Sequence, residues 1–557
     1  MAHLNLASVT YALADGRLLL QDVSLAVGMS ERVALIGANG AGKSTLLRII
    51  SGDLATNSGR ISRAGSMGFM RQFVTGETVN DLLLSFAPRG IRDAAARLVR
   101  AEAMMHERGT FQSQMAFASA VTAWGEAGGY DIEVLWDVCT VAALGVPFER
   151  CRNRLLSTLS GGEQKRLALE ALLRGQDDLL LLDEPDNSLD VPSKLWLEEQ
   201  LRATNKGVLY VSHDRELLAQ TATSIVTLEL NAAGNTAWTH PGAFDTYHCS
   251  REKRFDRLDE LRRRWDEEHT KLRSLMLTYK QKAAYNSKMA SRYRAAQTRL
   301  IRFEEAGPPQ EQPRKQRLEM RLRGGRTGKR VLICEALELT GLIHPFDFEA
   351  IFGDRVAVLG SNGSGKSHFL RLLAAGGTNP EAGQEPVVVS SINPVKHTGF
   401  ARLGARVRPG WFAQNRSRPD LAGRTLLDIL HRGDEYRQGL SREDASRAMA
   451  RYELAESAEQ QFDSLSGGQQ ARFQVLLLEL SGATMLLLDE PTDNLDLVSA
   501  ESLQQALNTF EGTVFAVTHD RWFARDFDRF LVFGASGEVY ESTEPVWGES
   551  KTVKRRT

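Results

Sequence analysis

Gly37-Ala38-Asn39-Gly40-Ala41-Gly42-Lys43-Ser44 recurs later in the chain as Gly360-Ser361-Asn362-Gly363-Ser364-Gly365-Lys366-Ser367. Each copy follows a short apolar run, at 33–36 or 356–359, and leads into a helical pattern. Glycines between a strand and a helix let backbone N–H groups wrap phosphate oxygens at the helix N-terminus. We therefore predict two phosphate-binding loops in two α/β domains. The residues expected to bind nucleotide are Gly37, Asn39, Gly40, Gly42, Lys43, Ser44 and Thr45 in the first copy, and Gly360, Asn362, Gly363, Gly365, Lys366, Ser367 and His368 in the second.

Three further motifs are repeated in the same order. The run Leu159–Gln164 returns as Leu465–Gln470, Asp183-Glu184-Pro185 returns as Asp489-Glu490-Pro491, and His213-Asp214-Arg215 returns as His519-Asp520-Arg521. Each of these pairs is 306 positions apart. This constant offset indicates a duplicated ATPase with one set of motifs in each half.

Each Asp-Glu pair follows an apolar run, 179–182 or 485–488, that is typical of a buried parallel strand. An aspartate at such a strand end holds Mg²⁺, so Asp183 and Asp489 are candidate metal ligands together with the hydroxyls of Ser44 and Ser367. The adjoining Glu184 and Glu490 are candidate general bases for the attacking water. Two purely structural carboxylates are the alternative, which the identical order in both copies disfavours.

Together these motifs resemble the ATP-binding cassette (ABC) superfamily, in which two cassettes dock head to tail and the Ser-Gly-Gly of one closes over the ATP of the other. The resemblance implies that Lys43 faces Ser466, Gly467 and Gly468, and that Lys366 faces Ser160, Gly161 and Gly162. It assigns Gln72 and Gln414 to the loop that helps to hold Mg²⁺, and Asp190 and Asp496 to the D-loop. His213 and His519 match the switch histidine, and both follow an apolar strand, which favours this role over that of a packed core histidine.

The two copies are not identical. Tyr11 lies where the superfamily places an aromatic ring against adenine, although a tyrosine there also suits a core, and the matching stretch 336–340 of the second copy has no ring. Asp186, Ser188 and His368 depart from the usual residues. Gln72 and Ser160 are 88 positions apart, against 52 for Gln414 and Ser466. The first copy therefore has an insertion with helical pattern near 89–136, either a structural elaboration or an arm that contacts a partner.

Composition restricts the class of protein. A chain of 557 residues suits two large domains and a connector. We expect a cytoplasmic protein, since no apolar run is long enough to span a membrane and no signal pattern begins the chain. The four cysteines are scattered, which excludes a zinc or iron–sulphur framework. That absence argues against a zinc-bearing DNA-repair ATPase and an iron–sulphur ribosome recycler.

The segment between the copies is strongly basic. Residues 251–330 contain 24 Lys or Arg and 11 Asp or Glu, and residues 271–302 contain nine basic residues and no acidic one. Apolar residues follow a heptad spacing at 258–279 and again at 289–303, which predicts an antiparallel hairpin of two helices that ends at Gly307. Basic groups beside aromatic rings suit RNA, although a merely solvated coiled coil is the alternative. The candidate RNA contacts are Lys280, Lys282, Tyr285, Lys288, Arg292 and Arg294.

Two cassettes joined by a charged helical hairpin resemble the ABC-F family over nearly the whole chain, and the hairpin with its apolar segment 275–279 resembles the antibiotic-resistance branch. The resemblance implies a monomer that binds ATP and Mg²⁺, pairs its cassettes internally and enters the ribosome beside rRNA and an exit-site or peptidyl-tRNA. A housekeeping translation factor and an ATPase subunit of a membrane transporter are the alternatives. The predicted organisation is a first cassette at 1–245, a hairpin at 246–312, a second cassette at 313–545 and a basic tail at 546–557.

Overall fold

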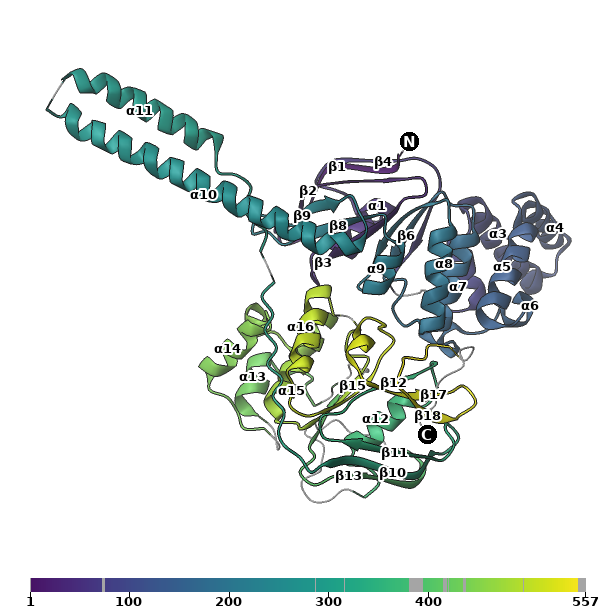
Figure 1. Cartoon of the computed structure of the whole chain (residues 1–557). Helices are drawn as coiled ribbons and strands as arrows, with labels where there is room; N and C mark the ends of the chain where they lie inside the picture. The colour runs from purple at the N-terminus through teal and green to yellow at the C-terminus, as the bar shows by residue number, and fades with distance from the viewer. Residues whose placement is uncertain are drawn as a thin grey trace.

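The computed structural model contains two α/β units of the same topology, with a long helical hairpin projecting from between them (Figure 1). This confirms the predicted fold class of two tandem cassettes joined by a helical pair. The structure describes residues 2–72, 76–285, 287–314, 316–379, 394–413, 418, 420–433, 437–493 and 495–548, without the side chains of residues 2, 3, 287 and 288.

The first cassette is built on a six-stranded sheet in the order β5-β6-β7-β3-β8-β9, in which only the β8–β9 pair is antiparallel. A three-stranded antiparallel sheet, β2-β1-β4, packs against it. Strands β6 and β7 are buried along their whole length, which explains their unbroken apolar sequences. The strands are β1 (Ala2–Ala12), β2 (Leu18–Gly28), β3 (Arg32–Gly37), β4 (Ser58–Arg63), β5 (Met67–Met70), β6 (Leu179–Asp183), β7 (Gly207–Val211), β8 (Ser224–Glu229) and β9 (Thr236–His240).

The helices of the first cassette begin at the motifs. Helix α1 follows the phosphate-binding loop directly, and Gly42 before it has φ +98°, a left-handed conformation that favours glycine. Ser160 begins α7 with a reciprocal capping box, since its hydroxyl accepts from the Glu163 N–H while the Glu163 carboxylate accepts from the Ser160 N–H. Asp190 caps α8 in turn. The helices are α1 (Lys43–Ser51), α7 (Gly161–Arg174), α8 (Val191–Ala203) and α9 (Arg215–Thr221).

A group of helices occupies the segment in which the sequence predicted an insertion, and it lies at the outer edge of the first cassette (Figure 1). These helices have their own small core, which includes Trp124, Trp136 and Phe148. They are α2 (Val79–Phe86), α3 (Arg89–Arg108), α4 (Phe111–Glu126), α5 (Gly129–Leu144) and α6 (Phe148–Cys151). Among the described residues, the second cassette has only α13 (Leu426–Arg432) and α14 (Arg442–Arg451) in the corresponding place.

The second cassette repeats the strand order, with sheets β14-β15-β16-β12-β17-β18 and β11-β10-β13. Val546 is buried in its core, so the cassette continues past residue 545, where the sequence predicted its end. Residues 549–557 of the predicted tail lie outside the described part. The remaining elements are β10 (Arg330–Leu339), β11 (Phe346–Ile351), β12 (Arg355–Gly360), α12 (Lys366–Ala374), β13 (His397–Leu403), β14 (Pro409–Phe412), α15 (Gly467–Ser481), β15 (Met485–Asp489), α16 (Leu497–Asn508), β16 (Thr513–Val517), β17 (Arg529–Phe533) and β18 (Val539–Ser542).

The hairpin consists of α10 (Phe244–Ala283) and α11 (Ser287–Ala306), which lie side by side (Figure 1). With 40 residues, α10 is about 60 Å long at 1.5 Å per residue. Its first turn belongs to the first cassette, because Phe244 and Tyr247 are buried in that core. Farther out, Trp265 stacks on Phe303 with 5.3 Å between ring centroids.

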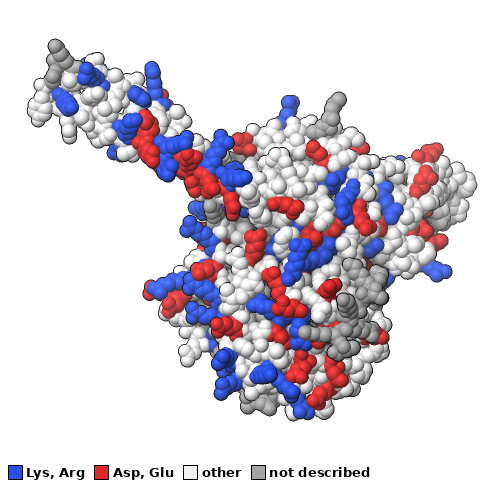
Figure 2. Space-filling model, viewed as in Figure 1, with Lys and Arg blue, Asp and Glu red and all other residues white. Residues whose placement is uncertain are grey.

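Charge is distributed unevenly along the hairpin. Figure 2 shows basic and acidic side chains mixed in the half nearer the cassettes, and basic side chains alone on the visible face of the outer half. Arg262 and Arg264 form ion pairs with Asp266 and Glu260 in the inner half. The outer half is therefore the part of the hairpin with unbalanced positive charge. Within the described chain, no helix combines the length and apolar character needed to cross a membrane.

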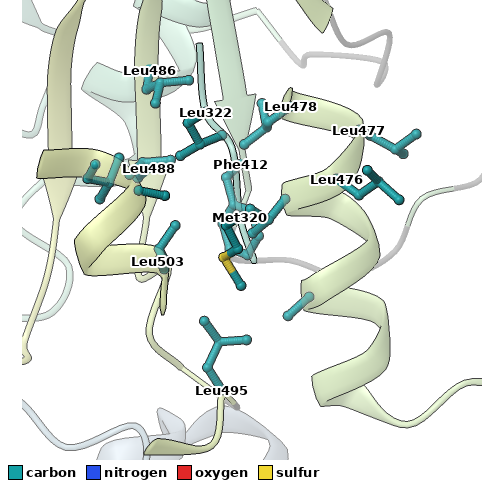
Figure 3. Packing of buried hydrophobic residues seen from close by; sticks show 14 of the residues in the cluster. Met320, Leu322, Phe412, Leu476, Leu477, Leu478, Leu486, Leu488, Leu495 and Leu503 are labelled. Atoms are coloured by element: carbon teal, nitrogen blue, oxygen red, sulfur yellow. The ribbon is translucent and has the colours of Figure 1, made fainter. Parts of the chain in front are cut away.

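An extended segment, residues 307–314 and 316–329, connects the hairpin to the second cassette, and we call it the strap. The backbone N–H of Arg314 donates to the Leu230 carbonyl at 3.0 Å, so the strap starts against the first cassette. Met320 and Leu322 are then buried in the core of the second cassette, close to Phe412 and Leu503 (Figure 3). The strap is thus part of the second cassette's core as well as a connector.

Truncation of this anchor gives a first testable prediction. Leu322→Ala removes a side chain that is 4% exposed, and we expect it to lower the free energy of unfolding of the second cassette by about 2–5 kcal/mol. Thermal denaturation followed by circular dichroism measures the effect. The exposed neighbour Arg323→Ala is the control and leaves the transition unchanged; equal transitions for both variants would contradict the anchoring role.

Candidate nucleotide sites between the two cassettes

The phosphate-binding loop of the second cassette lies opposite the Ser-Gly-Gly run of the first. Both line one cavity of about 410 Å³, with Gly363, Lys366 and Ser367 on one side and Ser160 and Gly161 on the other. The approach is close, since a Cβ atom on Gly162 would lie 3.6 Å from Nδ2 of Asn362. The Asn362 amide also donates to the Ser188 carbonyl at 3.5 Å. The fold therefore brings together residues of the two cassettes, such as Asn362 and Ser188, that are 174 positions apart in the sequence.

Lys366 lies inside the second loop. Its Nζ donates to the carbonyls of Gly360 at 2.8 Å and Ser361 at 2.7 Å. Burial lowers the pKa of Lys366, and nearby Glu490 and Asp489 offset part of that effect. A buried ammonium group at the N-terminus of a helix is suited to the phosphates of a nucleotide.

Two carboxylates face this loop. Ser367 Oγ donates to Asp489 Oδ1 at 3.1 Å. Burial, reinforced by Glu490, raises the pKa of Asp489 to about 7. Glu490 accepts from the backbone N–H of His519 at 3.0 Å, and burial raises its pKa as well. The second site thus holds two neighbouring carboxylates whose negative charge is poorly solvated.

The candidate switch histidine of the second site, His519, has a strongly lowered pKa. Burial lowers the pKa of His519 to about 3, with Lys366 and Lys194 adding to the effect. Its Nε2 lies 3.1 Å from Asn362 Oδ1 and 3.5 Å from Glu490 Oε1. The ring therefore bridges the phosphate-binding loop and the candidate base.

The first loop has the same internal arrangement. Lys43 Nζ donates to the carbonyls of Gly37 and Ala38 at 2.9 and 3.0 Å. The backbone N–H of Asn39 donates at 3.0 Å to Asp496, the D-loop aspartate of the second cassette. Burial alone would raise the pKa of Asp496, but hydrogen bonds from Ser499, the Asn39 N–H and Gln316 lower it to about 2. The first loop is therefore joined directly to the opposite cassette.

The acidic groups of the first site have different partners from those of the second. Gln72 Nε2 donates to Glu184 Oε2 at 2.7 Å. Burial and Lys43 lower the pKa of His213 to about 4, and neither ring nitrogen has a hydrogen-bond partner among the described residues. The two sites are therefore built from equivalent residues in unequal contacts.

The residues fit a divalent cation. Asp183 Oδ1 is buried without a hydrogen-bond partner in the described part of the chain, and burial raises the pKa of Asp183 to about 6 despite its hydrogen bond with Ser44. Ser367 and Asp489 form the equivalent hydroxyl–carboxylate pair. Hydroxyl and carboxylate oxygens are the ligands that Mg²⁺ prefers.

Both candidate bases have a strained backbone. Glu184 has φ +50° and Glu490 has φ +48°, left-handed values that are uncommon for residues with a side chain. The backbone N–H of Glu184 donates to the carbonyl of Val211 at the end of β7, and that of Glu490 to Val517 at the end of β16, each at 3.0 Å. Strain of this kind persists where the surroundings impose it and is concentrated at functional sites.

The other predicted residues are distributed as follows. Tyr11 is half-buried in β1 and packs against the core of the first cassette. Thr45 is half-buried in α1, while His368 is exposed and lines the second cavity. Ser466, Gly467 and Gly468 begin α15, which Ser466 caps together with Gln469. Gln414 lies outside the described residues.

The candidate RNA contacts lie at the outer end of the hairpin. Tyr285 is 93% exposed. The basic candidates Lys280, Lys282, Arg292 and Arg294 are exposed as well. The side chain of Lys288 lies outside the described part.

Sequence reasoning missed two side chains that contact the sites. Lys165 Nζ donates to the Glu184 carbonyl at 2.6 Å, and Gln316 in the strap donates to Asp496 at 3.2 Å. The sequence does carry a signal for Lys165, because the equivalent position of the second copy, 306 residues later, is Ala471 and the two copies therefore differ in charge there. Gln316 lies outside the repeat, and no sequence signal marks it.

Comparison with known proteins agrees with this geometry. A family model described as ABC transporter matches residues 20–187 and 343–493. An antibiotic resistance protein of Mycobacteroides abscessus is 60% identical over 98% of this chain and 100% of its own length. ABC transporter F family member 5 of Arabidopsis thaliana is 28% identical over 92% of this chain and 72% of its own. The energy-dependent translational throttle protein EttA of Mycobacterium tuberculosis is 28% identical over 95% of this chain and 90% of its own.

Proposed function

The chain belongs to the ABC-F family of ATP-binding cassette proteins, and we propose that it hydrolyses ATP to act on ribosomes and protects them from antibiotics. The observation that carries this proposal is the full-length similarity, at 60% identity, to a protein named for antibiotic resistance. The long hairpin with its basic outer half supports it, because two cassettes that only hydrolysed ATP would need no such projection.

Hydrolysis would use the residues of the two sites. Lys43 and Lys366 bind the outer phosphates, and the opposing Ser-Gly-Gly run closes each site. Glu184 and Glu490 each accept a proton from the attacking water, while His213 and His519 orient the phosphate end. Bound Mg²⁺ would neutralise charge on the phosphates, held by Ser44 with Asp183 and by Ser367 with Asp489, with help from Gln72 and Gln414.

The hairpin would reach ribosomal RNA. Its outer half carries exposed lysines and arginines for phosphates and an exposed tyrosine for unstacked bases. At about 60 Å, it extends well beyond the cassettes toward the peptidyl-transferase centre, beside an exit-site or peptidyl-tRNA. In the proposed role the protein acts in the cytoplasm as a monomer whose cassettes pair internally.

Substitutions of Tyr285 distinguish the contribution of base stacking to ribosome binding from that of positive charge. We expect Tyr285→Ala to weaken ribosome binding roughly five- to a hundredfold, because base–aromatic stacking contributes about 1–3 kcal/mol per base. Tyr285→Phe retains the ring and keeps the affinity. Co-sedimentation of purified protein with ribosomes measures both; an Ala variant that binds like the Phe variant would exclude stacking by this residue.

The function is tested by drug susceptibility of a deletion strain across peptidyl-transferase and exit-tunnel inhibitors. We expect increased susceptibility to at least one inhibitor, restored by the intact gene. In parallel, ribosome binding is expected to weaken steeply with salt, because phosphate contacts release counterions. Unchanged susceptibility to every inhibitor would refute the protective role.

Two other functions are distinguished by the same experiments. The 28% identity to the translational throttle protein favours, as the second candidate, a translation factor without a protective role. That function predicts unchanged susceptibility together with altered translation in the deletion strain. An ATPase subunit of a transporter predicts recovery with membranes instead of ribosomes, and the basic hairpin has no use in such a subunit.

A further inference from the structure

Aligning the two copies at their offset of 306 reveals a charged pair that only the first copy has. Lys194 and Asp186 in the first copy correspond to Ala500 and Thr492 in the second. All four line a cavity of about 50 Å³ at the junction of the two cassettes, together with His213 and Asp520. The two copies therefore differ in charged residues at the place where the cassettes meet.

Lys194 contacts the switch loops of both cassettes. Its side chain is 10% exposed, and its Nζ lies 2.9 Å from Asp214 Oδ2, next to the first switch histidine. The same Nζ donates to the carbonyl of His519, the second switch histidine, at 3.2 Å. Lys194 also lines the second nucleotide cavity. One ammonium group therefore connects two loops that are 306 positions apart.

His519, at one end of this contact, also lies beside the groups that are expected to act on the nucleotide. His519 accepts from Lys194 with its carbonyl and donates its backbone N–H to Glu490. Its ring also contacts Asn362 of the phosphate-binding loop. A shift of the His519 peptide would therefore move a hydrogen bond to the candidate base. The first switch loop receives no equivalent donor from position 500, because alanine stands there.

Lys194 is held as a cation. Burial alone would lower its pKa, but Asp214 and Asp186 outweigh burial and raise the pKa above its usual value. Other ion pairs cross the same interface, between Arg525 and Glu216 and between Arg521 and Glu198, but they lie farther along α8 and α9. Arg215 also joins the two switch loops, through Asp520 at 3.8 Å, but Lys194 donates to the carbonyl of His519 itself.

We propose that Lys194 is a positioning residue that fixes the second switch loop from the first cassette, so that full ATP turnover at the second site depends on this contact. This rests on the ATPase activity proposed above. The second copy has alanine at the position equivalent to Lys194, so the first site lacks this particular contact, and the two sites are expected to differ in their dependence on it.

The test must remove the lysine without leaving buried carboxylates unpaired, since a broken buried pair is strongly destabilising. The double variant Asp186→Thr, Lys194→Ala leaves net charge unchanged and installs the residues that the second copy already uses, while Asp214 still accepts from the backbone N–H groups of Glu216 and Leu217. Glu184→Gln as background reports turnover by the second site, and Glu490→Gln as background reports turnover by the first. Steady-state ATPase assays give kcat and KM for each.

We expect the double variant to lower second-site kcat about tenfold, with KM within twofold, and to leave first-site turnover within twofold. An equal loss at both sites would show a merely structural role and overturn the proposal, as would no loss at either. Asp186→Asn with Lys194→Met preserves side-chain volume and serves as the second variant if the first fails to fold. Absence of turnover in the Glu184→Gln background before any change at 194 would instead refute hydrolysis by Glu490.

Discussion

Replacement of both candidate bases, Glu184→Gln with Glu490→Gln, is expected to lower ATP turnover by about 10²–10⁴-fold while ATP binding remains intact. Glutamine keeps the size of glutamate and one acceptor oxygen but cannot take a proton from water. Both residues have a left-handed backbone, and the backbone N–H of each donates to the last residue of a neighbouring strand, Val211 of β7 or Val517 of β16. They are therefore expected to act alike.

The double variant is also expected to remain on ribosomes, because hydrolysis is the step that would release the closed cassettes. Phosphate release measures turnover, equilibrium binding of a fluorescent nucleotide measures affinity, and co-sedimentation measures retention. Glu199→Gln, an exposed glutamate on α8, is the matched control and behaves like the original protein. Undiminished turnover in the double variant would refute the assignment of both bases.

Charge reversal at the outer end of the hairpin should separate ATP hydrolysis from ribosome-linked function. We expect Lys280→Glu, Lys282→Glu and Lys288→Glu together to abolish protection in cells, because a surface that neutralises RNA phosphates becomes one that repels them. Spontaneous ATPase activity persists, since these residues lie on the hairpin and not in the cassettes.

The control keeps charge at the same positions. Lys→Arg at all three sites is expected to retain protection and the steep salt dependence of ribosome binding, whereas the Glu variant loses both. Drug susceptibility in cells and salt-dependent co-sedimentation are the measurements. Protection by the Glu variant equal to that of the Arg variant would exclude the basic end of the hairpin as the effector.

Much of the fold was predictable because its signals are local. The strand–loop–helix context of Lys43 and Lys366, the apolar strands before Glu184 and Glu490, and the heptad spacing of α10 and α11 are all patterns within a few turns or strands. The capping box at Ser160 shows why the Ser-Gly-Gly-Glu run begins a helix. Such patterns depend on periodicity and capping, which a single sequence displays directly.

The contacts between distant segments were decided by the tertiary structure. The sequence by itself determined two phosphate-binding cassettes, their paired carboxylates and a basic hairpin between them. Docking decided that Lys194 joins His519 to Asp214, that Gln316 reaches Asp496, and that Met320 and Leu322 anchor the strap in the second core. The physical reason is that hydrogen bonds and packing between residues hundreds of positions apart depend on how rigid units meet, and no local periodicity records that geometry.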